Sequence, residues 1–444
     1  MSSEWWMVVA IGCGFLLFGT WAVVVCAGPR ESSELRNWWL ASLVAGLILV
    51  RLALAMTTKG YVPDIATFSA WVAHATDGLA SFYADGYGAD YPPGYIYVLW
   101  LIAKLRQVLG LGFDSPSYLV VLKLPAILAD AVSVYVLYRL AQQHWSDKAA
   151  LAIAGLYAFN PAVIIDSAVW GQVDAVLTLF ILLGALCLEK RPAASAACFA
   201  IALLVKPQAL IFAPLPLFWF ADRLLRQTPR ATTDLSIFIG AAVATFCLGI
   251  LPFTLNQSPV WIVAKYGNTL ASYPFATVNA FNFFALNGAN FVPITERFLF
   301  LSYELWGYAF ITLILIFAGL TALKGRMSSR FWYLAAFLSV SVFVLSVKMH
   351  ERYLFPALAL TLAFAIVSHA RWGLYLFAGL SATQLLNVVE VLAFSEHKIY
   401  AVPSHDPLLL AGSLANVLLL LGLVLAGYWR YVKRAPLCTA EQVP

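Results

Sequence analysis

The chain has 444 residues, of which 62% are hydrophobic and only 11% are charged, and its formal net charge is +5. A water-soluble domain carries about 25% charged residues, so this composition excludes a soluble globular protein and predicts an all-α integral membrane protein. The small positive charge does not indicate a nucleic-acid partner, because the basic residues stand in short loops between apolar segments.

Apolar runs long enough to cross a bilayer as helices recur along the whole chain, since about 20 residues span its core. The predicted membrane-spanning segments are 5–27, 38–56, 118–141, 148–164, 171–188, 192–205, 208–221, 235–254, 298–323, 331–347, 353–368, 372–395 and 407–431. This pattern predicts about 13 transmembrane helices.

One further apolar run, 94–109, decides the topology. At about 1.5 Å per residue it would be about 24 Å long, short of a core of about 30 Å. If it does not cross, one side of the membrane receives 16 of the 27 Lys and Arg, as the positive-inside rule requires. We therefore expect 94–109 to lie in the outer interface, with the N-terminus outside and the C-terminus in the cytosol.

This topology divides the chain by its loops. Residues 1–37 are an extra N-terminal helix with a cytosolic loop, and 38–254 form a core module that contains the long outer loop 57–117. Residues 255–297 form a second outer loop expected to cover a site, and 298–444 supply the C-terminal helices and a cytosolic tail.

Ionisable residues are predicted to gather along the outer edge of the bundle, where charges usually face a cavity or a partner. They are Asp64, Asp90, Lys123, Asp130, Asp166, Asp174, Lys206, Lys348, His350, Glu351 and Arg352. Such a mixture of acids and bases suits a phosphate-bearing substrate and a carboxylate that accepts a proton.

Several of these residues also have structural interpretations. Asp64 follows Pro63 and precedes an amphipathic run, so it could be a helix N-cap. Asp90 stands before Pro92-Pro93 at a helix start, and Lys206 could extend its ammonium to the surface. His350-Glu351-Arg352 could be an interface turn with mutual salt bridges.

Six short motifs in order resemble the GT-C glycosyltransferase superfamily of membrane enzymes that use polyprenyl-phosphate sugars. They are Asp64-x-x-x-Phe68-x-x-Trp71, Asp90-Tyr91-Pro92-Pro93, Trp170-Gly171-Gln172-x-Asp174, Lys206-Pro207-Gln208, Tyr273-Pro274 with Asn279 and Asn282, and His350-Glu351-Arg352. The resemblance covers about residues 38–395. It is nearest to bacterial proteins related to the second mannosyltransferase of GPI-anchor assembly, and it extends to the glucosyltransferases of the N-glycan precursor.

The resemblance implies a GT-C fold whose first outer loop carries interfacial helices and a catalytic carboxylate, which Asp64 matches. His350-Glu351-Arg352 matches a motif that usually reads H-E-K in the N-glycan enzymes, and the arginine keeps the cation but changes its geometry. The N-glycan enzymes carry His-Phe-Gln near the position of Trp170-Gly171-Gln172. That departure favours mannose over glucose as the transferred hexose.

The implied reaction inverts the anomeric centre. A phosphate leaving group needs no general acid, so one base suffices, unlike the two carboxylates of a glycosidase. The residues expected on the donor phosphate and sugar are Arg352, His350, Glu351, Lys206, Lys348, Gln172 and Asp174, and those expected on the loop and acceptor side are Asp90, Tyr91, Trp71, Tyr273, Asn279 and Asn282. No cofactor and no divalent metal is predicted, because Pro63 stands where a neighbouring acid would be needed.

The expected partners are a polyprenyl-phosphate sugar, a lipid-linked or cell-envelope glycan acceptor and the bilayer. Short loops favour a bacterial plasma membrane, with the active site on the periplasmic or extracellular side. A transporter or flippase is the alternative class, although the chain shows no internal repeat. A non-catalytic scaffold is a third class.

Overall fold

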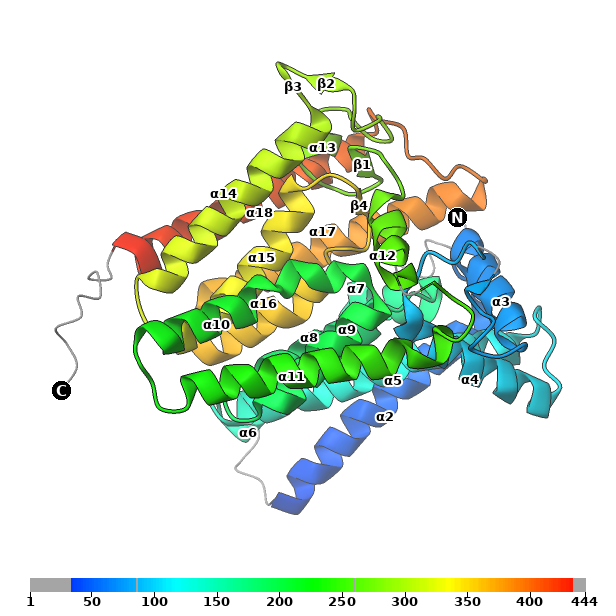
Figure 1. Ribbon diagram of the computed structural model, residues 1–444, viewed down its shortest axis with the longest axis horizontal. Coiled ribbons are helices and arrows are strands. Elements are labelled where there is room, and N and C mark those ends of the chain that lie inside the picture. The colour runs from blue at the N-terminus through cyan, green and yellow to red at the C-terminus, as the bar shows by residue number, and fades with distance from the viewer. Residues whose placement is uncertain (1–32, 85–86, 259, 434–444) are drawn as a thin grey trace. The chain divides into compact units, whose positions relative to one another are not determined.

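The computed structural model describes residues 33–84, 87–258 and 260–433, so the predicted span 5–27 lies outside the described residues. The described chain is mainly helical, and its four strands have two residues each (Figure 1). It forms two compact units. Unit 1 contains residues up to Ala209 together with Gly240–Ser272, and unit 2 contains Leu210–Ile239 together with the chain from Tyr273. The segment 255–297, predicted as one outer loop, is thus divided between the units after Ser272.

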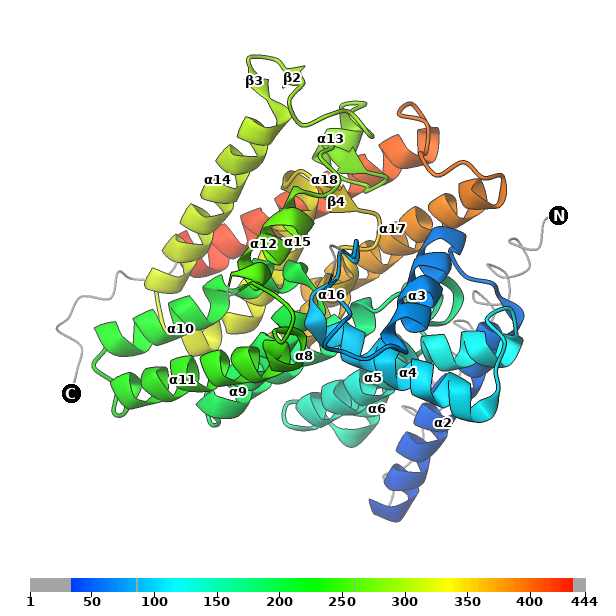
Figure 2. The ribbon, with the colours of Figure 1, turned by 45° about the vertical axis from the view of Figure 1, so that its right-hand side comes forward.

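Unit 1 is a helical bundle with a pair of helices, α3 (Val62–Ala75) and α4 (Pro93–Leu109), at one end (Figure 2). Its other elements are α2 (Ser33–Thr57), α5 (Pro116–Gln142), α6 (Asp147–Ala158), α7 (Pro161–Ile164), the π-helical segment η2 (Ile165–Trp170), α8 (Asp174–Cys187), α9 (Pro192–Val205), the first residues of η3 (Pro207–Phe212), the second half of α11 (Ala231–Ile250), η4 (Leu251–Phe253) and α12 (Trp261–Ala271). Helix α5 packs against α2, α6 and α8, α8 packs against α9, and α3 lies on α4 (Figure 2).

The helix starts in unit 1 follow from local sequence. Proline occupies the first turn of α4, α5, α7 and α9, where its missing N–H costs nothing. Ser115, Ser146 and Asn160 accept backbone N–H groups as N-caps. Gly110 ends α4 in the left-handed conformation, with φ of 62°.

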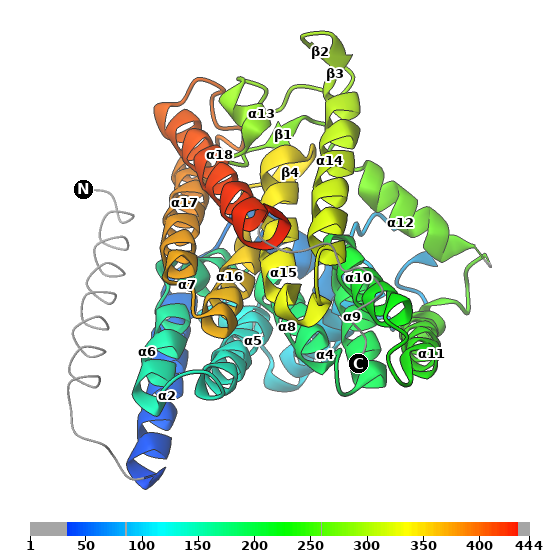
Figure 3. The same ribbon diagram turned by 90° about the vertical axis from the view of Figure 1, so that its left-hand side faces the viewer.

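Unit 2 contains the remaining helices and the short strands. Its elements are α10 (Pro214–Leu225), the first half of α11, β1 (Thr277–Val278), α13 (Phe283–Leu286), β2 (Arg297–Phe298), β3 (Leu301–Ser302), α14 (Tyr303–Leu323), η5 (Met327–Ser329), α15 (Phe331–Leu345), β4 (Met349–His350), α16 (Phe355–Ser368), α17 (Arg371–Glu396), α18 (Pro407–Gly427) and η6 (Tyr428–Lys433). Helices α15, α16, α17 and α18 pack in succession (Figure 3). Strand β1 pairs in parallel with β4, and β2 pairs with β3 in antiparallel fashion.

The helices confirm the prediction of an all-α integral membrane protein. Within the described residues, seven helices are long and apolar enough to cross a membrane, or eight if the bent pair Asp147–Ala158 and Pro161–Trp170 is one span. Four further apolar helices, α8, α9, α15 and α16, coincide with predicted spans but have only 14 or 15 residues. At about 21–23 Å each they are shorter than the bilayer core, so the total of 13 crossings stays a prediction.

Helix α4 contains the run 94–109 and is not among the span-length apolar helices. It buries Tyr95, Ile96 and Leu99 on one side and exposes Leu101 and Val108 on the other. The helix packs on its neighbours through one apolar face, and the interfacial position of 94–109 stays a prediction.

Asp130 differs from its predicted place at the outer edge. It lies in the middle of α5, it is fully buried, and its Oδ2 is 3.1 Å from Arg51 Nε of α2. The sequence pattern could not show this ion pair, because the two residues are 79 positions apart on helices that meet only in the folded unit.

Candidate active site

Asp64 stands in the first turn of α3, where the helix N-terminus favours a negative charge. The helix begins at Val62, with Tyr61 in the N-cap position, so the interpretation of Asp64 as an N-cap is wrong. The reason is that proline is tolerated in the first turn, which lets the helix start before Pro63. The half-buried Asp64 carboxylate is therefore available for tertiary contacts.

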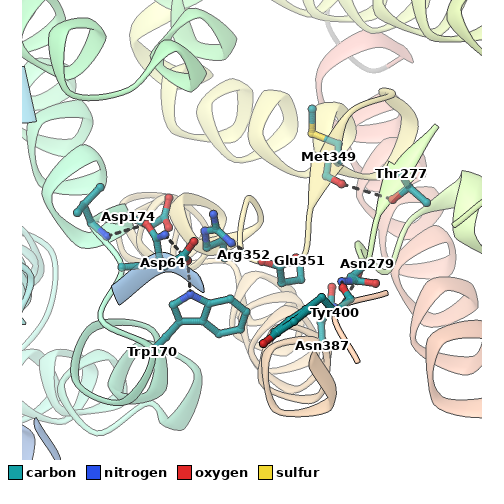
Figure 4. Close-up of polar contacts among 12 residues, drawn as sticks. Asp64, Trp170, Asp174, Thr277, Asn279, Met349, Glu351, Arg352, Asn387 and Tyr400 are labelled. Atoms are coloured by element: carbon teal, nitrogen blue, oxygen red, sulfur yellow. Dashed lines mark hydrogen bonds and ion pairs between the residues drawn. The ribbon is translucent and has the colours of Figure 1, made fainter. Parts of the chain in front are cut away.

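Two side chains, one from the last residue of η2 and one from the turn that follows it, donate hydrogen bonds to the same carboxylate oxygen. Trp170 Nε1 and Gln172 Nε2 each lie 2.6 Å from Asp64 Oδ2 (Figure 4). Short bonds of this kind are charge-assisted and stronger than bonds between neutral groups. The Asp64 carboxylate thus connects α3 to the end of η2.

Gly171 makes this double contact possible. It adopts a left-handed conformation with φ of +88°, and a Cβ there would lie 2.9 Å from Ile65 Cδ1. The turn directs the side chains of Trp170 and Gln172, which flank the glycine, to one carboxylate. The Trp170 ring also stacks on Tyr61 at 4.4 Å, and its carbonyl accepts the Tyr61 N–H at 3.2 Å, which fixes the start of α3.

A buried cation lies on the other side of Gln172. Lys206 Nζ is 3.2 Å from Gln172 Oε1 and 2.8 Å from Asp174 Oδ1. The Lys206 and Asp174 side chains are 1% and 2% exposed, so their charges are compensated inside the protein, as burial requires. Lys206 does not extend to the surface.

Tyr91 and Trp71 complete the surroundings of this network in unit 1. Tyr91 donates from its hydroxyl to Gln172 Oε1 at 3.1 Å. Its ring packs against Trp71 at 5.2 Å and against Phe68 at 5.7 Å, so the face of α3 that follows Asp64 rests on the start of α4. The structure therefore brings together Asp64, Trp71, Tyr91, Gln172, Asp174 and Lys206.

Asp90 is half-buried beside α12. Its carbonyl accepts the Thr269 hydroxyl at 2.7 Å, which ties the loop before α4 to α12. The ammonium of Lys265, also on α12, lies over the Tyr83 ring at 5.2 Å. Burial lowers the pKa of Lys265 to about 8, although the Asp90 carboxylate acts in the opposite direction.

The His350-Glu351-Arg352 motif lies in unit 2, at the end of β4. Arg352 Nη1 and Glu351 Oε1 form an ion pair, and both side chains are buried (Figure 4). The His350 ring meets the Tyr273 ring edge-on at 4.7 Å. Lys348 has a positive φ of 62° and donates its backbone N–H to the Phe275 carbonyl, so the motif is fixed to the segment that carries β1.

Asn279 fixes the backbone around β1. Its side-chain oxygen accepts from Asn290 Nδ2 and from the Val402 N–H. Its Nδ2 donates to the Tyr400 carbonyl, and its own carbonyl accepts from Asn387 Nδ2 (Figure 4). Its φ of 55° is one that asparagine tolerates better than most residues. This network accounts for Asn279 without a substrate contact.

Asn282 is the N-cap of α13 and accepts from the backbone N–H groups of Phe284 and Ala285. It therefore orders the turn after β1. In unit 2 the structure brings together His350, Glu351, Arg352, Tyr273 and Lys348, and it gives Asn279 and Asn282 backbone contacts.

Sequence reasoning missed some residues of both clusters. Trp170 belongs to a recognised motif but was not assigned to the site, although it donates directly to Asp64. Asn290 and Asn387 were not singled out at all. A polar amide in an otherwise apolar span, as Asn387 is in α17, was the available signal.

No group of three or more His, Cys, Asp or Glu side chains suited to a metal ion occurs among the residues that the structure describes.

The fold and these clusters define an all-α integral membrane protein with a carboxylate held by two N–H donors. Residues 70–265 match the model of the ALG6, ALG8 glycosyltransferase family, which indicates a glycosyltransferase of the GT-C type and, by class, a hexosyltransferase. The match contains Tyr91, Trp170, Gln172, Asp174 and Lys206, and it begins six residues after Asp64. A search of the curated proteins found no match to the chain.

Proposed function

We propose that the protein transfers a hexose from a polyprenyl-phosphate donor to a hydroxyl of a lipid-linked or cell-envelope glycan on the non-cytosolic face of its membrane. The observation that carries the proposal is the Asp64 carboxylate, held by Trp170 and Gln172 at 2.6 Å each. A transferase of this type needs one positioned base, and Asp64 meets that need.

In the proposed reaction, Asp64 accepts the proton of the acceptor hydroxyl. At the same time the oxygen of that hydroxyl attacks the anomeric carbon of the donor. A new glycosidic C–O bond forms, the bond from the anomeric carbon to the phosphate oxygen breaks, and the electron pair leaves with the phosphate. Direct attack inverts the anomeric centre. The departing polyprenyl phosphate carries the developing negative charge, which cations must stabilise.

We assign the donor phosphate to Arg352, with His350 and Lys348 as further donors. A guanidinium can hold two phosphate oxygens at once, and Glu351 beside it fixes its position. Asp90, Tyr91, Trp71 and Tyr273 are assigned to the acceptor side. The proposal includes no metal, and full activity in EDTA is its expected outcome.

The test is product identification. The purified protein is incubated with radiolabelled polyprenyl-phosphate mannose and, separately, polyprenyl-phosphate glucose, together with membrane lipids as acceptors. We expect a product that carries one added hexose of inverted configuration, with mannose preferred over glucose. Movement of labelled lipid across the bilayer without a new glycosidic bond would instead favour the flippase class.

The bacterial plasma membrane and the outward-facing site are part of the same proposal. A cysteine placed at Asp77, which is exposed after α3, tests the face. We expect a membrane-impermeant thiol reagent to label it in intact cells from outside. Labelling that occurs only in inverted membrane vesicles would contradict the outward-facing site.

A further inference from the structure

Gln172 connects the Asp64 carboxylate to Lys206 and to Tyr91 within unit 1. Its Nε2 donates to Asp64 Oδ2 at 2.6 Å. Its Oε1 accepts from Lys206 Nζ at 3.2 Å, from the Tyr91 hydroxyl at 3.1 Å and from the Val173 N–H at 3.2 Å. The residue is 1% exposed, so these protein groups determine its conformation.

The donors around Gln172 allow one orientation of its amide. An ammonium group and a backbone N–H can donate hydrogen bonds but cannot accept them. The group that faces Lys206 and Val173 must therefore be the amide oxygen, and the NH₂ must face Asp64. A flipped amide would set NH₂ against the ammonium and oxygen against the carboxylate, with repulsion at both ends.

Asp174 keeps this buried cation in place. Its Oδ1 lies 2.8 Å from Lys206 Nζ, and both side chains are almost completely buried. Removing one member of such a pair leaves an uncompensated buried charge. Because Asp174 begins α8 and Lys206 ends α9, the antiparallel packing of these two helices fixes the pair.

We propose that Lys206 and Gln172 are positioning residues for Asp64: the Lys206 ammonium fixes the Gln172 amide so that its NH₂ holds the Asp64 carboxylate. The proposal rests on the function assigned to Asp64 above. It replaces direct contact with the donor as the role of Lys206, Gln172 and Asp174, because these three side chains are almost completely buried and contact one another inside unit 1.

The contacts of the Asp64 carboxylate make the pH dependence of turnover a readout of the Gln172 orientation. Two N–H donors stabilise a carboxylate relative to the neutral acid. If Gln172 presented an oxygen to Asp64, the carboxylate would lose a donor and gain a repulsive neighbour, so the base would become protonated at a higher pH. The titratable residues of unit 1 that contact this network include Tyr61, Tyr91, Lys123, Asp166, Asp174 and Lys206.

Gln172→Glu is the sharpest test, because it keeps the shape of the side chain and sets a second carboxylate against Asp64. In the purified protein we expect the acidic limb of the pH profile of kcat/KM to move to higher pH by about one unit or more. The donor KM, measured above that limb, should change less than threefold. A residue that contacts the donor would change KM instead.

Lys206 provides the second arm. Lys206→Arg retains a cation that can only donate, so we expect the acidic limb to stay within a few tenths of a pH unit of its original position. Lys206→Met lets the amide turn, so we expect the same upward movement as in Gln172→Glu, but smaller. If Gln172→Glu does not fold, the comparison of these two Lys206 variants decides the question.

Gln142→Glu is the matched control. Gln142, at the end of α5, also donates from its amide to an aspartate, Asp147, at 2.9 Å, but it takes no part in the Asp64 network. Its pH profile should not move.

Asp64→Asn separates this inference from the proposed function. An inactive Asp64→Asn together with an unmoved acidic limb in Gln172→Glu and Lys206→Met overturns the positioning role and leaves the function intact. A higher donor KM in Lys206→Met with an unmoved limb overturns it in favour of a phosphate contact. An active Asp64→Asn removes Asp64 as the base.

Discussion

Unit 1 contains two buried ion pairs that differ in what they connect. Arg51 and Asp130 join α2 to α5, and Arg51 also donates to the Ala158 carbonyl of α6 at 2.8 Å, so this pair connects three helices. Lys206 and Asp174 join α9 to α8, but Lys206 continues through Gln172 to Asp64. The same kind of interaction is structural in one place and connected to the proposed base in the other. What distinguishes the two pairs is the group that each cation contacts besides its aspartate. For Arg51 this is the Ala158 carbonyl, and for Lys206 it is the Gln172 side chain.

The Arg51–Asp130 pair offers the largest expected effect. Arg51→Met leaves Asp130 charged and buried, so we expect a loss of about 3–5 kcal/mol in the free energy of unfolding. Thermal unfolding in detergent measures this. The double variant Arg51→Met/Asp130→Leu removes both charges and should recover most of the stability and keep hexosyl transfer.

The corresponding double variant of the other pair sharpens the contrast. Lys206→Met/Asp174→Leu should unfold at nearly the original temperature, because apolar residues can replace a buried pair. Its transfer activity should nevertheless fall at neutral pH. If both double variants behaved alike in the transfer assay, the distinction between the two pairs would be lost.

Arg352 is a third buried cation, in unit 2, paired with Glu351. If it holds the donor phosphate, Arg352→Ala should raise the donor KM by about 10- to 100-fold, because a hydrogen bond to a charged group contributes about 1.5–3 kcal/mol. Arg352→Lys keeps the charge but not the two-point contact, so its effect should be smaller. Unchanged donor KM in both variants would exclude the phosphate role.

Lys265, on α12, is a cation whose charge we expect to change within a workable pH range. Its pKa is lowered to about 8 by burial, so its positive charge is present below pH 8 and is lost as the pH rises above it. If that charge orders the Asp90 loop for the acceptor, the acceptor KM should rise a few-fold between pH 7 and pH 9. Lys265→Arg stays charged and should abolish the rise. A rise that persists in Lys265→Arg would assign it to another group.

Much of the fold could be predicted from the sequence, because apolar runs and their flanking cations report on membrane spans directly. Helices α2, α5, α14, α17 and α18 lie close to the bounds predicted from their apolar runs. The run 94–109 became α4, outside the set of span-length apolar helices. Helix α9 has its predicted bounds, and α15 and α16 differ from theirs by two residues at one end. Helix α8 is shorter than predicted, because the turn at Gly171 delays its start to Asp174.

The Asp174–Lys206 contact could have been anticipated. The two residues lie at equal distances along the chain from Lys190, in the turn between α8 and α9, so antiparallel packing places them opposite one another. The bonds from Trp170 and Gln172 to Asp64 could not, because they join positions more than 100 residues apart. Which oxygen each donor meets depends on the left-handed turn at Gly171, and no sequence pattern reports that angle.

The most direct test of the account is the turnover number of Asp64→Asn with a polyprenyl-phosphate hexose donor, measured beside Asp77→Asn. Asp77 stands after the same helix but is exposed. If Asp64 is the base, kcat should fall by about 100- to 10,000-fold with the donor KM nearly unchanged, while Asp77→Asn keeps the original rate. A folded Asp64→Asn protein whose kcat stays within a few-fold of the original would contradict the account.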